Sequence, residues 1–156
     1  MQLQGKEPQP RVRVEVVMWP FASNRLDLGC GRGGDIGKWR GANVRQVVAL
    51  DLSAGQLNEA RVRAGGRSRG QGRGRRPPGA QGPGRGRGTQ ITWKQCDMLE
   101  PALASSIQRD LVAAGAAAGA DAVAAMFCMQ YSFGSADAAS QLLSQIGAML
   151  RPGGVL

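Results

Sequence analysis

One stretch near the start of the chain restricts the fold more than any other, the run Leu-Asp-Leu-Gly-Cys-Gly-Arg-Gly-Gly-Asp at residues 26–35. A strand can turn into a helix within so few residues only where glycine supplies positive φ angles. A second apolar run, residues 46–50, ends in Asp51. The pattern predicts a strand, a glycine turn, a helix and a second strand tipped by a carboxylate, which together form the first half of a nucleoside-cofactor site.

The Gly-x-Gly-x-x-Gly spacing of residues 29–34 also satisfies the dinucleotide fingerprint, so the glycines alone do not identify the cofactor. A dinucleotide carries a pyrophosphate, which favours bare amides at a helix N-terminus. S-adenosyl-L-methionine instead carries two cationic groups, which Asp27 and Asp35 on either side of the glycines would attract. Asp51 suits the ribose hydroxyls of either cofactor class. We therefore expect S-adenosyl-L-methionine, with a nicotinamide dinucleotide and a cofactor-free turn as the alternatives.

Strand and helix patterns alternate along the rest of the chain. Further strands are predicted over about 91–96 and 121–127, and a fifth is predicted to begin at 155–156, where the sheet is expected to be truncated. This alternation predicts an α/β fold with a doubly wound, mainly parallel, Rossmann-like sheet. Ligands of such sheets lie beyond the carboxyl ends of the strands.

Four candidate ligand groups follow or end predicted strands. They are Asp27, Asp51, Asp97 and Tyr131. Because the carboxyl ends of parallel strands meet at one edge of a sheet, we expect these four side chains to converge there.

The basic character of the chain is concentrated in one segment. The net charge is +9, yet residues 65–88 contain seven arginines and no acid. We divide the chain into a poorly defined N-terminal segment at 1–23 and one partial domain at 24–156. A Gly/Arg-rich insert at 64–89 interrupts this domain, and its lack of large aliphatic side chains predicts disorder.

Several kinds of chemistry are excluded by composition. The 156-residue chain contains no histidine, which rules out a Ser-His-Asp arrangement and histidine-based acid–base catalysis. Its three cysteines are far apart, which fits reduced thiols and argues against a metal site. We expect no metal, and no segment has the pattern of a membrane span or a secretory signal.

With these residues placed, the chain resembles the mRNA cap guanine-N7 methyltransferases. The matching stretches are residues 26–35 with Lys38-Trp39 after them, then 48–51, 96–97 and finally Phe-Cys-Met-Gln-Tyr-Ser-Phe at 127–133. The resemblance covers about residues 25–63 and 90–156. Gly-Gly-Asp with Lys-Trp, together with Tyr-Ser-Phe, is more specific to cap enzymes than the glycine turn, which is common to the wider methyltransferase class.

The resemblance implies a role for each matched residue. On the cofactor side, Gly29 would contact the methionine part, Asp51 the ribose and Asp97 the adenine, while Tyr131 would line the methyl-transfer site. On the cap side, basic residues at matching positions would contact the phosphates or the nucleoside; these are Arg32, Lys38 and Arg63.

Two positions depart from the family string Gln-Phe-x-x-His-Tyr-Ser-Phe. Met126 takes the place of the glutamine, and Gln130 takes the place of the histidine. Gln130 would still offer the guanine a donor and an acceptor. The family's regions beyond the fifth strand have no counterpart in this chain, so we expect a fragment of a longer enzyme.

Methyl transfer to guanine N7 requires no general base, because N7 carries a lone pair and no proton. We therefore predict an alignment-driven reaction without a catalytic acid–base residue. The implied partners are capped RNA and, in a nuclear setting, other capping enzymes or the RNA polymerase machinery, with the chain itself a monomer. Two alternatives are another methyltransferase of the same fold with a different substrate, and a non-catalytic protein that binds RNA through the Arg/Gly insert.

Overall fold

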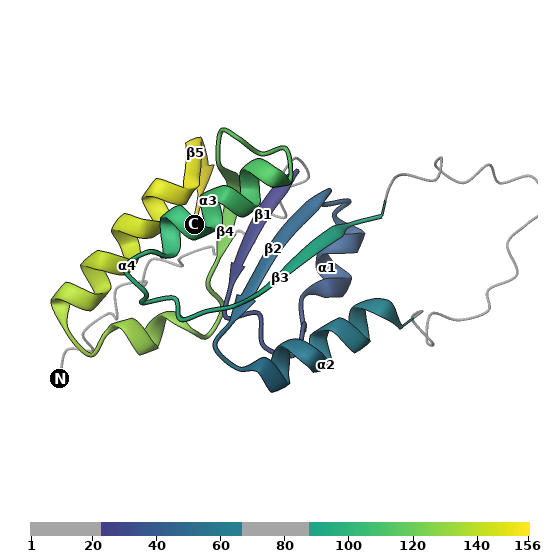
Figure 1. The fold of residues 1–156 in the computed structure, drawn as a ribbon, viewed down its shortest axis with the longest axis horizontal. Helices are drawn as coiled ribbons and strands as arrows, with labels where there is room; N and C mark the ends of the chain where they lie inside the picture. Colours follow the sequence, from purple (N-terminus) through teal and green to yellow (C-terminus); the bar gives the residue numbers. More distant parts are fainter. Residues whose placement is uncertain (1–22, 67–87) are drawn as a thin grey trace, which may run out of the picture.

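The computed structural model describes residues 23–66 and 88–156 (Figure 1). Most of the predicted N-terminal segment and of the predicted insert, residues 1–22 and 67–87, therefore lies outside the described residues. The strands are β1 (Asn24–Leu28), β2 (Gln46–Asp51), β3 (Gln90–Gln95), β4 (Ala120–Ala124) and β5 (Leu150–Val155). The helices are α1 (Ile36–Gly41), α2 (Ala54–Gly65), α3 (Leu103–Ala113), α4 (Ala136–Met149) and the 3-10 helix η1 (Met129–Ser132). None of these helices is both long enough and apolar enough to cross a bilayer.

All five strands of the described residues form one parallel sheet in the order β3-β2-β1-β4-β5. The first described strand, β1, lies in the middle of the sheet; β2 and β3 extend the sheet on one side of it, and β4 and β5 extend it on the other. The predicted doubly wound parallel sheet is confirmed. The strand order reverses between β1 and β4, and a doubly wound sheet binds its ligand at such a point.

Helices cover both faces of the sheet, as the alternation of side chains along β2 dictates. Val48 and Leu50 pack with the apolar faces of α3 and α4, whereas Val47 and Ala49 pack with α1 and α2 (Figure 1). Trp39 of α1 is 1% exposed and is part of this second cluster. Because β1 and β2 are buried on both faces, they are held rigidly, and the loops at their carboxyl ends have a firm base.

Three element boundaries differ from the prediction by more than one residue, and the first is the start of β5, which lies at Leu150 and not at residue 155. Helix α2 continues through Gly65, two residues into the segment assigned to the insert, and ends where Gly66 donates to the Val62 carbonyl at 2.9 Å. Strand β4 ends at Ala124 rather than at Phe127. Phe127 has a φ angle of +56°, which is incompatible with an extended strand, so the strand ends before it and the chain turns toward η1.

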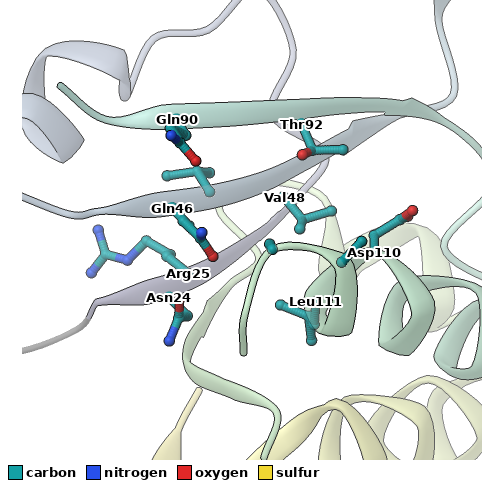
Figure 2. A pocket seen from close by; sticks show the side chains of 11 residues that line it. Asn24, Arg25, Gln46, Val48, Gln90, Thr92, Asp110 and Leu111 are labelled. Carbon is teal, nitrogen blue, oxygen red and sulfur yellow. The ribbon is translucent and has the colours of Figure 1, made fainter. Parts of the chain in front are cut away.

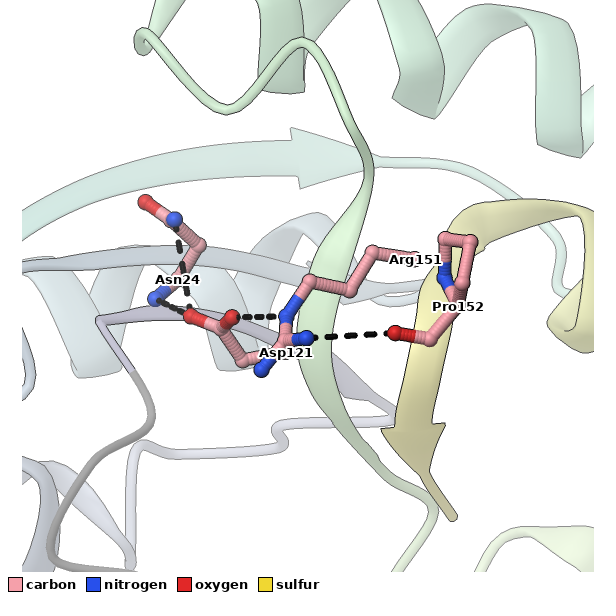
Figure 3. A network of polar contacts seen from close by, with 4 residues as sticks. All are labelled: Asn24, Asp121, Arg151 and Pro152. Atoms are coloured by element: carbon pink, nitrogen blue, oxygen red, sulfur yellow. Dashed lines mark hydrogen bonds and ion pairs between the residues drawn. The ribbon is translucent and has the colours of Figure 1, made fainter.

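A polar network at the amino edge of the sheet joins β1, β4 and β5 (Figure 3). The carboxylate of Asp121 accepts a hydrogen bond from the Asn24 backbone amide at 2.7 Å and pairs with the Arg151 guanidinium. Strand β5 pairs with β4 through Leu150 and Val155, so residues 151–154 bulge out between two paired residues. The ion pair therefore holds β5 in place across this bulge.

Candidate functional site at the carboxyl edge of the sheet

A cavity of about 550 Å³ opens beyond the carboxyl ends of β1, β2, β3 and β4. Three of the four predicted ligand groups line it, together with the predicted Gly29. The lining residues from the turn and from the segment after β2 are Gly29, Gly31, Leu50, Asp51, Leu52, Ser53 and Gln56. Those after β3 and β4 are Cys96, Asp97, Met98, Leu99, Met126, Phe127, Cys128 and Tyr131.

The glycine turn provides the floor of this cavity. Gly29 and Gly31 have φ angles of +69° and +54°, a region that other residues rarely adopt. A Cβ atom on Gly29 would lie 2.7 Å from the Cβ of Cys128, which itself is held by a hydrogen bond from its thiol to the Leu28 carbonyl at 3.0 Å. The absence of a side chain at Gly29 therefore lets Cys128 pack directly against the turn.

Replacement of Gly29 by alanine is expected to destabilise the chain by about 2–4 kcal/mol, from the unfavourable φ angle and the contact with Cys128 together. Gly34→Ala is the matched control, because a Cβ there would meet nothing within 4 Å. Urea unfolding of the two variants checks the difference. Equal stability of both would show that the turn is not under the steric constraint described.

Asp51 is held in one orientation by two backbone amides. Its Oδ2 accepts from the Gly31 amide at 2.8 Å, and its Oδ1 accepts from the Ser53 amide at 2.8 Å. The carboxylate thus links the glycine turn to the start of α2, where the Ser53 hydroxyl accepts from the Gln56 amide at 3.3 Å. Each carboxylate oxygen retains a lone pair that can accept a further hydrogen bond from a ligand.

Asp97 and Tyr131 form the opposite wall of the cavity. Asp97 is exposed, and its Oδ1 accepts from the Leu99 amide at 2.9 Å, which fixes the carboxylate just beyond β3. Tyr131 lies on η1 and is 71% exposed, beside Phe127 at 88%. Such exposure of two aromatic side chains at a cavity mouth is typical of a surface that a ring-bearing ligand covers.

Asp27 differs from the other acids, because it lies inside the protein. It is 2% exposed on β1 and does not line the cavity. Burial is the main reason that the pKa of its carboxyl is raised to about 7; the negative charge of Asp35 also raises this pKa, whereas Arg25 and Lys38 lower it. The group therefore lies beneath the glycine turn as a carboxyl that exchanges its proton near neutral pH. Its part in cofactor binding stays a prediction.

The predicted cap-side residues lie outside the lining of the cavity. Arg32 pairs with Glu59 at 3.3 Å, and Lys38 pairs with Asp35 at 2.5 Å, so both are on the α1/α2 side of the turn. Arg63 is exposed in the last turn of α2, the end farther from the cavity. Their roles stay predictions.

Gln130 also lies outside the lining of the cavity, on η1 one residue before Tyr131. It is exposed, and its Nε2 donates to the Phe127 carbonyl at 2.6 Å. Its Oε1 is left to accept from a ligand, so the predicted role toward guanine stays a prediction.

Several lining residues were not predicted from the sequence. Leu52, Met98 and Leu99 lie within two residues after Asp51 or Asp97. This position next to a predicted ligand residue was the indication that the sequence offered. No sequence pattern indicated Cys128, because it reaches the floor of the cavity only through its packing against Gly29. Burial raises the pKa of the Cys128 thiol to about 11, so it is a neutral thiol and not a nucleophile at physiological pH.

A second cavity, of about 220 Å³, lies at the opposite, amino edge of the sheet (Figure 2). Polar side chains at the starts of the strands line it, among them Arg25, Gln46 and Gln90. The Arg25 Nε and Gln46 Oε1 atoms are buried there without a hydrogen-bond partner in the described part of the chain. None of the predicted site residues lies at this edge, so the site is assigned to the carboxyl edge.

A parallel sheet in this order, with an acid-lined cavity over a glycine turn, is the fold of the S-adenosylmethionine-dependent methyltransferases. One similar solved structure is a methyltransferase of this class from Clostridium acetobutylicum, with a TM-score of 0.54 and 17% identity; it covers 84% of this chain and 39% of that chain. Another is the SAM-bound amino pentose methyltransferase from Micromonospora echinaspora, with a TM-score of 0.52 and 22% identity, which covers 88% and 43%. These likenesses establish the fold.

The sequence places the chain within one family of this class. The model of the mRNA (guanine-N(7))-methyltransferase domain matches residues 20–156, and the chain belongs to this family. It is 37% identical over 138 residues to the mRNA cap guanine-N(7) methyltransferase of Pyricularia oryzae and 30% identical over 131 residues to enzyme 1 of that name from Arabidopsis thaliana. These alignments cover 84% and 83% of this chain, but only 28% and 30% of the relatives. The chain thus spans less than a third of the length of the relatives it matches.

Proposed function

We propose that this chain contributes the cofactor half of an enzyme that transfers a methyl group from S-adenosyl-L-methionine to N7 of the guanine cap of RNA. The observation that carries the proposal is the convergence of Gly29, Asp51, Asp97 and Tyr131 on one cavity in a chain of the cap methyltransferase family. The named activity of the relatives supports the substrate.

The residues present fit this cofactor. Asp51, oriented by two amides, would accept from both ribose hydroxyls, and Asp97 would accept from the adenine amino group. Gly29 and Gly31 line the cavity without side chains, so the methionine part would lie directly against their backbone. Asp27 and Asp35 would place negative charge near the cationic groups.

The cofactor, when bound, supplies an activated methyl group. The chain's own residues need only hold donor and acceptor in line, and such orientation contributes about 7–11 kcal/mol to lowering the barrier. Tyr131 and Phe127 would cover the reacting face, since both are exposed at the mouth of the cavity. With no proton to remove from N7, no side chain has to act as a base.

On the substrate side, we assign Arg32, Lys38 and Arg63 to the phosphates or nucleoside of the cap, and Gln130 to the guanine. The positive charge of Arg32, Lys38 and Arg63 supports their assignment to the phosphates, because arginine and lysine form charge-assisted hydrogen bonds with phosphate. The hydrogen bond from Gln130 Nε2 to the Phe127 carbonyl orients the side chain. Its Oε1 is then free to accept a hydrogen bond from guanine. We further assign the protein to the nucleus as a monomer that meets capped transcripts, other capping enzymes and the polymerase machinery.

Titration calorimetry with S-adenosylhomocysteine tests the cofactor assignment, and transfer of labelled methyl groups to a GpppG-capped RNA tests the substrate. We expect measurable binding and capped-RNA methylation that is weak, because the chain spans so little of its relatives. The control is the same RNA with a 5′-triphosphate in place of the cap. Absence of binding at millimolar ligand by folded protein would refute the cofactor assignment, and equal labelling of both RNAs would refute the cap assignment.

A further inference from the structure

Charge is distributed unequally between the two halves of the described chain. Residues 23–66 contain seven basic and four acidic side chains, whereas residues 88–156 contain three basic and five acidic ones. The first half provides α1 and α2 on one face of the sheet, and the second provides α3 and α4 on the other (Figure 1). The excess of positive charge therefore lies on the α1/α2 face.

Much of this positive charge lines the contact between α1 and α2, which we call the α1–α2 seam and define by Arg32, Lys38, Arg40 and Arg63 with the acids Asp35 and Glu59. Arg32 pairs with Glu59, and the Nη2 of Arg40 donates to the Ala64 carbonyl at 2.5 Å. Glu59 and Arg63 are four residues apart on α2, so they share one flank of the helix. The glycine turn, α1 and this flank thus form one continuous surface.

The two ends of the seam differ in their charge balance. At the end near the glycine turn, Arg32 and Lys38 each have an acidic partner. At the other end, neither Arg40 nor Arg63 takes part in an ion pair with any described residue, and both are exposed. The bond from Arg40 to a carbonyl satisfies one donor but leaves its charge uncompensated. The far end therefore carries two free positive charges.

About two turns of α2 separate this end from the cavity. Gln56 lines the cavity, and Arg63 follows seven residues later on α2, which corresponds to a rise of about 10 Å. A phosphate chain that starts beside the cavity and runs along the seam reaches both arginines. Arginine binds phosphate through two parallel hydrogen bonds, without regard to base sequence.

We infer that the far end of the seam, Arg40 with Arg63, binds backbone phosphates of the nucleotides that follow the cap, so that the seam guides the RNA strand away from the methyl-transfer site. The inference rests on the proposed function and extends it from the cap to the body of the substrate. It assigns Arg40, which the family resemblance did not single out, to substrate binding, and it moves the phosphate contact of Arg63 from the cap to the strand that follows it.

The test compares Arg40→Gln with two matched variants of exposed arginines. Arg61→Gln lies on the same helix, but two residues from both Glu59 and Arg63 and so on another flank, and Arg109→Gln lies on α3 on the opposite face. Binding is measured for a GpppG-capped 10-nucleotide RNA, the uncapped RNA and the GpppG dinucleotide. The arginines at 67–87 remain in every variant, so their contribution cancels.

Loss of one phosphate contact to a single strand should lower the salt-dependence slope by about 0.7, which corresponds to about 8-fold weaker RNA binding at 50 mM salt. We expect this loss for Arg40→Gln with both RNAs, a loss no greater than about twofold for GpppG, and little effect of the two control variants. Arg40→Lys keeps the charge and should retain most of the salt dependence.

Three results would overturn the inference. Equal losses of RNA affinity in Arg40→Gln and Arg61→Gln would mean that the RNA responds to the overall positive charge of the surface and not to a contact at Arg40. An equal loss for GpppG and RNA would place Arg40 on the cap itself. Unchanged RNA binding in a folded Arg40→Gln variant would show that the far end of the seam does not contact the RNA. If the parent chain fails to bind GpppG, the proposed function is at fault, while the uncapped RNA still decides the role of the seam.

Discussion

Replacement of Asp51 by alanine should weaken the binding of S-adenosylhomocysteine at least 100-fold, as measured by titration calorimetry. Hydrogen bonds to a charged group contribute about 1.5–3 kcal/mol each, and the carboxylate would accept from two ribose hydroxyls. A loss of about 3 kcal/mol or more follows, since 1.4 kcal/mol corresponds to a tenfold change in affinity. The variant also leaves the Gly31 and Ser53 amides without their acceptor, which loosens the turn.

A ligand control separates the loss of ribose contacts from the loss of local structure. A 2′,3′-dideoxy analogue of S-adenosylhomocysteine lacks the hydroxyls that Asp51 would bind, so the variant should cost this analogue much less affinity than it costs the parent ligand. Asp137→Ala, which removes an exposed acid from α4 on the other face, should leave both affinities unchanged. If Asp51→Ala, shown to be folded, binds S-adenosylhomocysteine as tightly as the parent does, the site is wrongly assigned.

The second large effect is on stability, and it comes from Asp27. The folded-state pKa of its carboxyl is raised from 3.8 to about 7, mainly by burial. Below pH 3.8 the carboxyl is neutral in both states; between pH 3.8 and pH 7 the unfolded state releases the proton while the folded state still holds it, and above pH 7 both states are ionised. Stability is therefore lost with rising pH, by about 2–3 kcal/mol between pH 5 and pH 8.

Asp27→Asn removes this titration while keeping the shape of the side chain. We expect the variant to gain about 2–3 kcal/mol relative to the parent between pH 5 and pH 8, in urea unfolding at the two values. Asp137→Asn is the control for the loss of one exposed carboxyl. A parent and an Asp27→Asn variant with parallel pH profiles would contradict the burial of a titrating acid. If Asp27 also faces the cationic cofactor, the stabilised variant should bind that ligand more weakly at pH 8.

Much of the site was predictable because it is built from backbone. The glycine turn and the positions of Asp51 and Asp97 depend on where strands end, and strand ends are marked locally by apolar runs followed by an acid or by glycine. Parallel pairing then forces these ends to one edge of the sheet. Of the four side chains expected at this edge, Asp51, Asp97 and Tyr131 line one cavity, and Asp27 does not.

Sequence patterns could not show how deeply a side chain is buried or which residues from other strands and helices it contacts. Asp27 and Asp51 both belong to strand patterns that end in acids, yet one is buried under the turn and the other lines the cavity. Phe127 fitted a strand pattern, but its φ angle turns the chain toward η1 and leaves the ring exposed.

Local periodicity and glycine placement were thus sufficient for the parallel α/β architecture and for the edge that carries the site, because both follow from interactions between residues near in sequence. The proton affinity of Asp27, the packing of Cys128 against Gly29 and the alignment of Arg40 with α2 depend on residues brought together from separate elements. Burial and electrostatic environment are properties of the assembled layers, so they emerge only when the helices have packed on the sheet.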